Sequence, residues 1–247
     1  MRTLYIILFV LIGSLSFSAI NCKDVTSNYS TSGGDKVIQE ERKVEKFDGI
    51  GLSISGDVKL IQGSPQKVIV EGAASDIEKI ETVVEGSKLK IKTKHGSWHI
   101  GKLTYYITME NVKDFSISGS GSIIADNAIS ADGLSLSISG SGNILLADLK
   151  AVNNVESHIS GSGSITVSGK TQAKKHEIHI SGSGDVIANQ LQTQDADVHV
   201  SGSGNCKLVV SNRLEVRVSG SGDVYYSGKP VIDASISGSG KLKETTF

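Results

Sequence analysis

The sequence has few aromatic residues and almost no proline, and both shortages limit the folds open to it. Aromatic side chains make up 5% of the 247 residues, which is little for a globular core, and only 2 Pro are present. The formal net charge is −1 and no basic stripe stands out, so nucleic acid is not a predicted partner. Beyond the first residues, no run approaches about 18 apolar residues, so no later transmembrane helix is predicted.

Glycine is the abundant residue. The chain has 28 Gly, separated by short segments rich in Val, Ile and Ser. β-Branched residues between glycines are typical of short strands joined by tight turns. This composition predicts an all-β protein.

Residues 1–21 are predicted to be a signal peptide, because Arg2 precedes a short apolar run and small residues follow. Cys22 stands where processing is expected and is a candidate lipidation site. Asn21 is larger than the residue that usually precedes a lipidated Cys, so simple cleavage nearby stays the alternative. We expect an exported cell-envelope protein, as an outer-membrane lipoprotein or at the cell surface, and otherwise periplasmic or secreted. The polar residues 22–42 are predicted to form a flexible tether.

A repeat dominates the C-terminal half. The steps between its copies are 21, 21, 21, 20, 18 and 18 residues, a period typical of a solenoid. We predict a right-handed parallel β-helix, or β-solenoid, with about 18–21 residues per coil over residues 116–247. Residues 43–115 are predicted to be a strand-rich part stacked on it, and a degenerate copy at residues 53–57, three steps before the first repeat, suggests eroded coils there. Ser-Gly-Ser-Gly begins at Ser118, Ser139, Ser160, Ser181, Ser201, Ser219 and Ser237.

Aligning the copies separates inward from outward positions. Aliphatic residues recur at alternate positions on both sides of the repeat, so they should form inward ladders about 4.8 Å apart. The repeat itself is interpreted as a corner, where glycine supplies positive φ angles and lets neighbouring backbones stack closely. Cys206 occupies an inward position and is expected to pack as a small hydrophobe, with a disulfide to Cys22 as the alternative.

Four short segments precede the Ile-Ser-Gly-Ser-Gly repeats in a characteristic order. They are residues 47–50 (FDGI), 58–63 (VKLIQG), 68–72 (VIVEG) and 86–91 (GSKLKI). Together with the repeats, these segments resemble the auto-transporter adhesin head, GIN-type domain family of bacterial envelope proteins. The resemblance covers about residues 45–245 and implies a parallel β-helix-like fold, export and frequent lipoprotein signals, but no established activity. The weak lipoprotein motif at Cys22 departs from the family's pattern.

Two outward columns are the candidate binding residues. Acidic residues recur four positions before the repeat, and His or Arg recur two positions before it in four consecutive copies. We interpret them as a solvated face with cross-rung pairing that could recognise a glycan or an envelope surface protein. The candidates are Glu156, His158, Glu177, His179, Asp197, His199, Glu215 and Arg217.

Metal binding is the alternative for the outward columns and for a second set of polar residues after the repeat. Imidazole and carboxylate groups are zinc ligands, but stacked rings about 4.8 Å apart are too far from one another to share one ion with bonds of about 2.1 Å. Asp57, Asn143, Asp185, Asn205 and Asp223 share a register after the repeat, where turn capping competes with calcium binding. We predict no metal, no cofactor and no catalytic residues. The function we predict is a non-catalytic envelope binding or adhesion module, with a pectinase-like enzyme or a structural spacer that associates with itself as alternatives.

Overall fold

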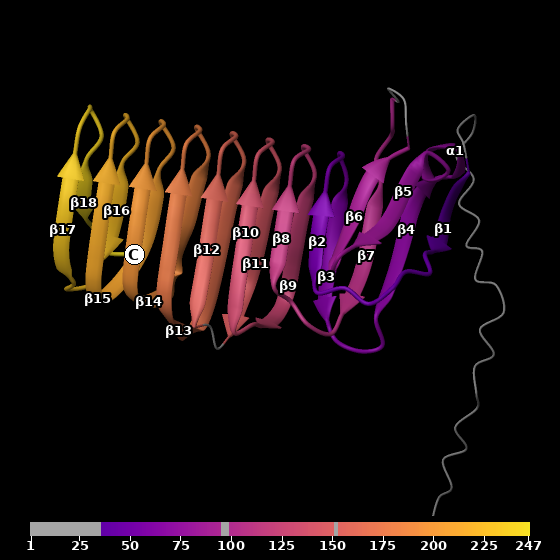
Figure 1. Cartoon of the computed structure of the whole chain (residues 1–247), viewed down its shortest axis with the longest axis horizontal. Coiled ribbons are helices and arrows are strands. Elements are labelled where there is room, and N and C mark those ends of the chain that lie inside the picture. The colour runs from indigo at the N-terminus through magenta and orange to yellow at the C-terminus, as the bar shows by residue number, and fades with distance from the viewer. Residues whose placement is uncertain (1–35, 95–98, 151–152) are drawn as a thin grey trace, which may run out of the picture.

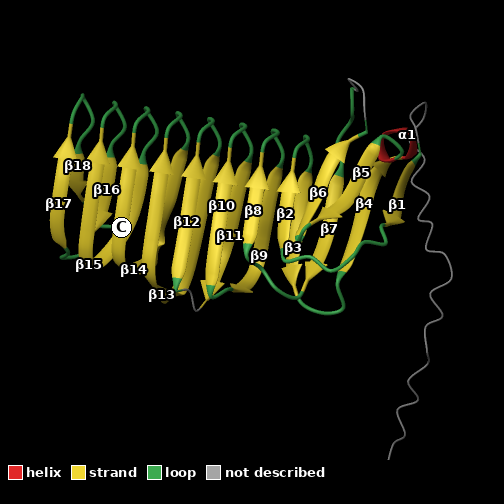
Figure 2. Ribbon diagram, in the orientation of Figure 1, coloured by secondary structure: helices red, strands yellow, loops and turns green. Residues whose placement is uncertain are grey.

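The computed structural model describes residues 36–94, 99–150 and 153–247. Its strands stack side by side into one elongated β-solenoid, which confirms the predicted fold class (Figures 1 and 2). Each Ser-Gly-Ser-Gly joins two strands that run in opposite directions, and the pair forms one rung of the stack. We call the strand before the turn the layer-one strand and the strand after it the layer-two strand.

Strand bounds follow the repeat. From β13 to β15, one continuous strand supplies the layer-two strand of one rung and the layer-one strand of the next. The repeat region contains β8 (Asp114–Ile117), β9 (Ser122–Ser130), β10 (Gly133–Ile138), β11 (Asn143–Lys150), β12 (Asn154–Ile159), β13 (Ser164–Ile180), β14 (Asp185–Val200), β15 (Cys206–Val218), β16 (Val224–Ser227), β17 (Val231–Ile236) and β18 (Leu242–Glu244).

Neighbouring rungs pair parallel and in register, as equivalent repeat positions require. Ile138 of β10 pairs with Ile117 of β8 on one side and with Ile159 of β12 on the other. The core between the two layers is a set of such aliphatic ladders, which are almost completely buried. Alternation of side chains along each strand therefore sends one apolar set inward, as predicted.

Glycine in the repeat serves close stacking rather than positive φ. Among the glycines of the seven repeats, only Gly238 has a φ in the left-handed range, at 129°, so the predicted role in supplying positive φ is wrong for the others. The turns instead lie directly on one another, and the Ser162 N–H donates to the carbonyl of Gly140 at 3.1 Å. A Cβ on Gly161 would overlap that same carbonyl, so side chains are excluded for steric reasons.

The N-terminal part holds two further rungs in an order that differs from the sequence. One joins β2 (Gly49–Leu52) to β3 (Asp57–Gln62), and the other joins β6 (Lys88–Thr93) to β7 (Thr104–Met109). β2 pairs with both β6 and β8, so the earlier rung lies between two later ones. The prediction of eroded coils placed the degenerate copy three coils before the first repeat, and this spacing is wrong. The rung of β2 and β3 lies directly beside the rung of β8 and β9, although 63 residues separate the two turns in the sequence.

Antiparallel strands close this end of the stack. β4 (Lys67–Ala73) pairs with β7, and β5 (Ile80–Glu85) pairs with β6. A short helix, α1 (Ala74–Ile77), connects them and buries Ile77. The remaining strand, β1 (Val37–Glu41), pairs with β4, so the predicted tether ends before residue 37. The reason is that Ile38 packs on the core and the Arg42 side chain donates to the carbonyl of Ile77.

The other end of the stack is open. In the last rung of the described residues, β17 pairs in register with β15, and no further rung among these residues covers it. Val231, Ile232 and Ile236 are consequently 76%, 41% and 41% exposed. Within the described residues, no helix has the length and apolar character needed to cross a bilayer. The predicted signal peptide and Cys22 lie outside the described residues.

Candidate functional site

The predicted site residues lie in two adjacent outward columns on layer one. The pairing register places Glu156, Glu177, Asp197 and Glu215 on consecutive rungs. The same register places the neighbouring column beside it, two residues closer to the turn. That column runs through His158, His179, His199 and Arg217.

Basic side chains compensate the acidic column. The Lys175 ammonium contacts the Glu177 carboxylate and lies 2.9 Å from Asp197. These two contacts raise the pKa of Lys175 above its usual value, with the hydrogen bond to Glu177 as the largest cause. Further along, Arg217 lies 3.0 Å from Glu215 and 3.3 Å from Asp233. The repulsion expected between stacked carboxylates is therefore offset by ion pairs that cross rungs.

The three histidines stack face to face. The ring centroids of His158 and His179 are 5.0 Å apart, and those of His179 and His199 are 4.9 Å apart. Desolvation, followed by the flanking imidazoles, lowers the pKa of His179, so this ring is neutral at neutral pH. Among the described residues, no group of three His, Cys, Asp or Glu side chains is placed to hold a metal ion.

The histidine column borders a groove that sequence reasoning missed. Two hollows of about 380 and 280 Å³ follow one another along the stack, the first reaching His158 and the second beginning at His179. One wall is the outward column, and the other is the first serine of each turn, such as Ser160 and Ser181. We call these two hollows the histidine groove. The repeat carried a signal for it, because each copy places an exposed serine two residues after the column.

The acidic and amide side chains after the turn cap the neighbouring rung. Asn143 Oδ1 accepts hydrogen bonds from the backbone and hydroxyl of Ser164, at 3.2 and 2.8 Å. Asp185 Oδ1 accepts from the backbone N–H of Asn205 at 2.7 Å, and Asn205 Oδ1 accepts from that of Asp223 at 3.0 Å. This arrangement favours the turn-capping interpretation of these positions over calcium binding.

Cys206 is fully buried in the inward ladder and makes no disulfide with any residue that the structure describes, while its predicted alternative partner, Cys22, lies outside them. Burial raises the pKa of its thiol. Tyr105 is buried in β7 near the closed end, while Tyr225 lies in β16 near the open end.

Comparisons with known proteins agree with this architecture. A family model described as "Putative auto-transporter adhesin, head GIN domain" matches residues 46–230. Among curated proteins, no sequence matches.

Solved structures share the fold at low sequence identity. A "putative adhesin" from Bacteroides fragilis is 22% identical with a TM-score of 0.80, over 86% of this chain and 98% of that chain. A "putative adhesin" from Parabacteroides distasonis is 22% identical with a TM-score of 0.69, over 86% and 98%. A "putative lipid binding protein" from the same species has the same identity and TM-score, over 87% and 98%.

Proposed function

Because the chain belongs to the auto-transporter adhesin head, GIN-domain family, we propose that it is a non-catalytic adhesion-type module of the cell envelope. In this proposal it binds an extended, hydroxyl-rich polymer, a glycan strand, along the histidine groove. The observation that carries the proposal is that a turn serine recurs from rung to rung along that groove, opposite an outward column that includes His158, His179 and His199.

The chemistry of the groove suits a neutral sugar chain. Serine hydroxyls and imidazole rings donate and accept hydrogen bonds, as sugar hydroxyls do. An extended pyranose chain advances per residue by a length similar to the strand spacing of about 4.8 Å, so successive sugars could meet equivalent contacts. Ion pairing of the neighbouring carboxylates with Lys175 and Arg217 supports recognition rather than acid–base catalysis.

Binding is expected to strengthen with ligand length. Chito-oligosaccharides of increasing length, titrated into the purified protein by calorimetry, should gain affinity until the groove is filled, because each added sugar repeats a contact. The double variant His179→Ala/His199→Ala should weaken binding of the longer chains about tenfold, the equivalent of one or two lost hydrogen bonds. The matched control is His99→Ala, which removes an exposed imidazole near the closed end.

Affinity that does not depend on chain length, or equal losses in both variants, would contradict groove binding. Release of new reducing ends from the oligosaccharides or from pectin would show an enzyme instead. Self-association through the open end stays a prediction. Glu244 opposes it, because this residue occupies the inward register of Tyr226, and a contact there would bury its carboxylate.

Anchoring through Cys22 is the second part of the proposal. An acylated Cys22 would hold the solenoid at a membrane through the residues that precede β1. Cys22→Ala is expected to move the protein from the membrane fraction to the soluble fraction. The several acyl chains of a lipoprotein hold it firmly at a membrane, and the variant would carry none of them. Mass spectrometry of the extracted protein measures the acylation directly, and an unmodified Cys22 in the membrane fraction would refute it.

A further inference from the structure

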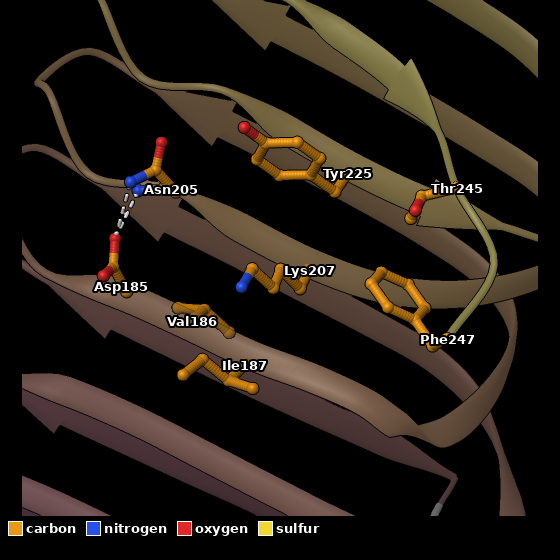
Figure 3. A pocket seen from close by; sticks show the side chains of 8 residues that line it. All are labelled: Asp185, Val186, Ile187, Asn205, Lys207, Tyr225, Thr245 and Phe247. Atoms are coloured by element: carbon orange, nitrogen blue, oxygen red, sulfur yellow. Dashed lines mark hydrogen bonds between the residues drawn. The ribbon is translucent and has the colours of Figure 1, made fainter.

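A pocket on the opposite layer has no part in the proposed groove. It lies on the outer surface of layer two, near the open end, and has a volume of about 460 Å³ (Figure 3). This volume is within the range typical of small-molecule sites. The rungs of β14, β15 and β16 form its floor, and the chain after β18 forms one side. Its lining residues are Asp185, Val186, Ile187, Asn205, Lys207, Tyr225, Thr245 and Phe247.

The floor is ordered by the rung register. Ile187, Lys207 and Tyr225 occupy the same outward column on three consecutive rungs. The segment after β18 is held by the Thr245 N–H, which donates to the carbonyl of Tyr226 at 2.8 Å. This places the Phe247 ring beside the stem of Lys207, as Figure 3 shows.

The two aromatic rings differ in how they are fixed. The Tyr225 hydroxyl donates to Asp223 at 3.0 Å, and the Lys243 ammonium lies 5.0 Å from the centre of the tyrosine ring. Lys243 is itself paired with Asp223. The Tyr225 ring is therefore held in place, whereas the Phe247 ring is 51% exposed.

Lys207 differs from these neighbours. Its exposed side chain has no ion pair and no side-chain hydrogen bond among the described residues, although it lies between Tyr225 and Asp185 in the pocket. Asp185 and Asn205 bond to each other at the same end of the pocket. The pocket thus combines an unpaired cation, two ring faces, and a carboxylate and an amide that can accept hydroxyl protons.

We propose that this pocket binds a carboxylated sugar of the hexuronic acid class. Such a sugar has one carboxylate for Lys207, a C–H face for Phe247 and Tyr225, and hydroxyls for Asp185 and Asn205. A charge-assisted hydrogen bond to Lys207 fixes the orientation of the ring. Because it needs no histidine of the groove, the site is independent of the proposed function.

The test is a titration of the purified protein with D-glucuronate at low ionic strength, followed by calorimetry or ligand-observed NMR. D-glucose has a hydroxymethyl group in place of the carboxylate and should bind at least tenfold more weakly. Lys207→Met should weaken glucuronate binding at least tenfold and leave glucose binding unchanged. Phe247→Ala should weaken binding of both sugars, because both present a C–H face.

The matched control is Lys59→Met. Lys59 is exposed in the same outward column of layer two, near the closed end of the stack, so its loss should leave glucuronate binding unchanged. The proposal is overturned if glucuronate does not bind, if glucose binds as tightly, or if Lys207→Met binds normally. Benzoate binding as tightly as glucuronate would also overturn it, because benzoate has the charge and the ring but no hydroxyls. Chito-oligosaccharide binding should be normal in Lys207→Met, which separates this result from the groove proposal.

Discussion

Gly161→Ala is expected to lower the free energy of unfolding by about 4 kcal/mol or more, among the largest effects of a single methyl group. The added Cβ would overlap the Gly140 carbonyl oxygen and would lie 2.8 Å from the carbonyl carbon. Both atoms belong to the backbone of the neighbouring turn, so no rotamer change can relieve the clash. The Ser162 N–H to Gly140 carbonyl bond would lengthen with it. Urea or guanidinium unfolding, followed by circular dichroism, measures the loss.

Gly133→Ala is the matched control for this variant. Gly133 begins β10 in the same repeat region, and a Cβ there would meet nothing within 4 Å. Its φ lies outside the left-handed range, so alanine fits, and we expect a change within about 1 kcal/mol, with a gain possible from the less flexible unfolded chain. Equal losses in the two variants would mean that loss of glycine flexibility, and not the close approach of the turns, explains the repeat.

The unfolding free energy is expected to fall by about 3 kcal/mol between pH 6.5 and pH 4 because of His176. This imidazole is fully buried, and burial lowers its pKa to about 4 from an ordinary value of 6.5. Between these two values the unfolded chain binds a proton that the folded chain does not, so lowering the pH favours unfolding. The ring is held neutral beside Ser157, whose hydroxyl lies 3.0 Å from Nε2.

The double variant His176→Leu/Ser157→Ala removes both buried polar groups and should flatten this part of the pH profile. His179, whose pKa is also lowered by desolvation, would leave a slope of the same sign. His99→Gln removes an exposed imidazole and serves as the control. Denaturant unfolding at half-unit pH steps measures all three. A slope that survives the double variant undiminished would place the titrating group elsewhere.

The repeat region could be predicted closely because its contacts repeat with the sequence. Aligning the turns was sufficient to place Ile117, Ile138 and Ile159 in one ladder and His158, His179 and His199 in another, since in-register stacking brings equivalent positions together. The alternation of side chains along a strand then separates the positions that face the core from those that face solvent. Ser157 and His176 also followed this rule, although they are polar, and they meet in the core.

The N-terminal part could not be predicted in the same way. Local patterns identified its strands, but they did not indicate that β2 lies between β6 and β8, because neighbours in space are separated there by a long insertion. The sequence also did not indicate that β1 belongs to the antiparallel strands that close the stack. The reason is related, since β1 becomes a strand only by pairing with β4. The histidine groove was missed because its depth depends on how the turns project beyond the strands.

The number of repeats in this protein can change without a change of fold, because the antiparallel strands close only one end of the stack. In the repeat region of the described residues, each rung pairs its backbone with only its two neighbours, so a duplicated repeat would fit between existing ones without altering either end. Such a duplication would lengthen the molecule by about 4.8 Å and extend the histidine groove by one more serine and one more outward side chain. Repeats can therefore be added or removed, and the length of the protein can change while its fold stays the same.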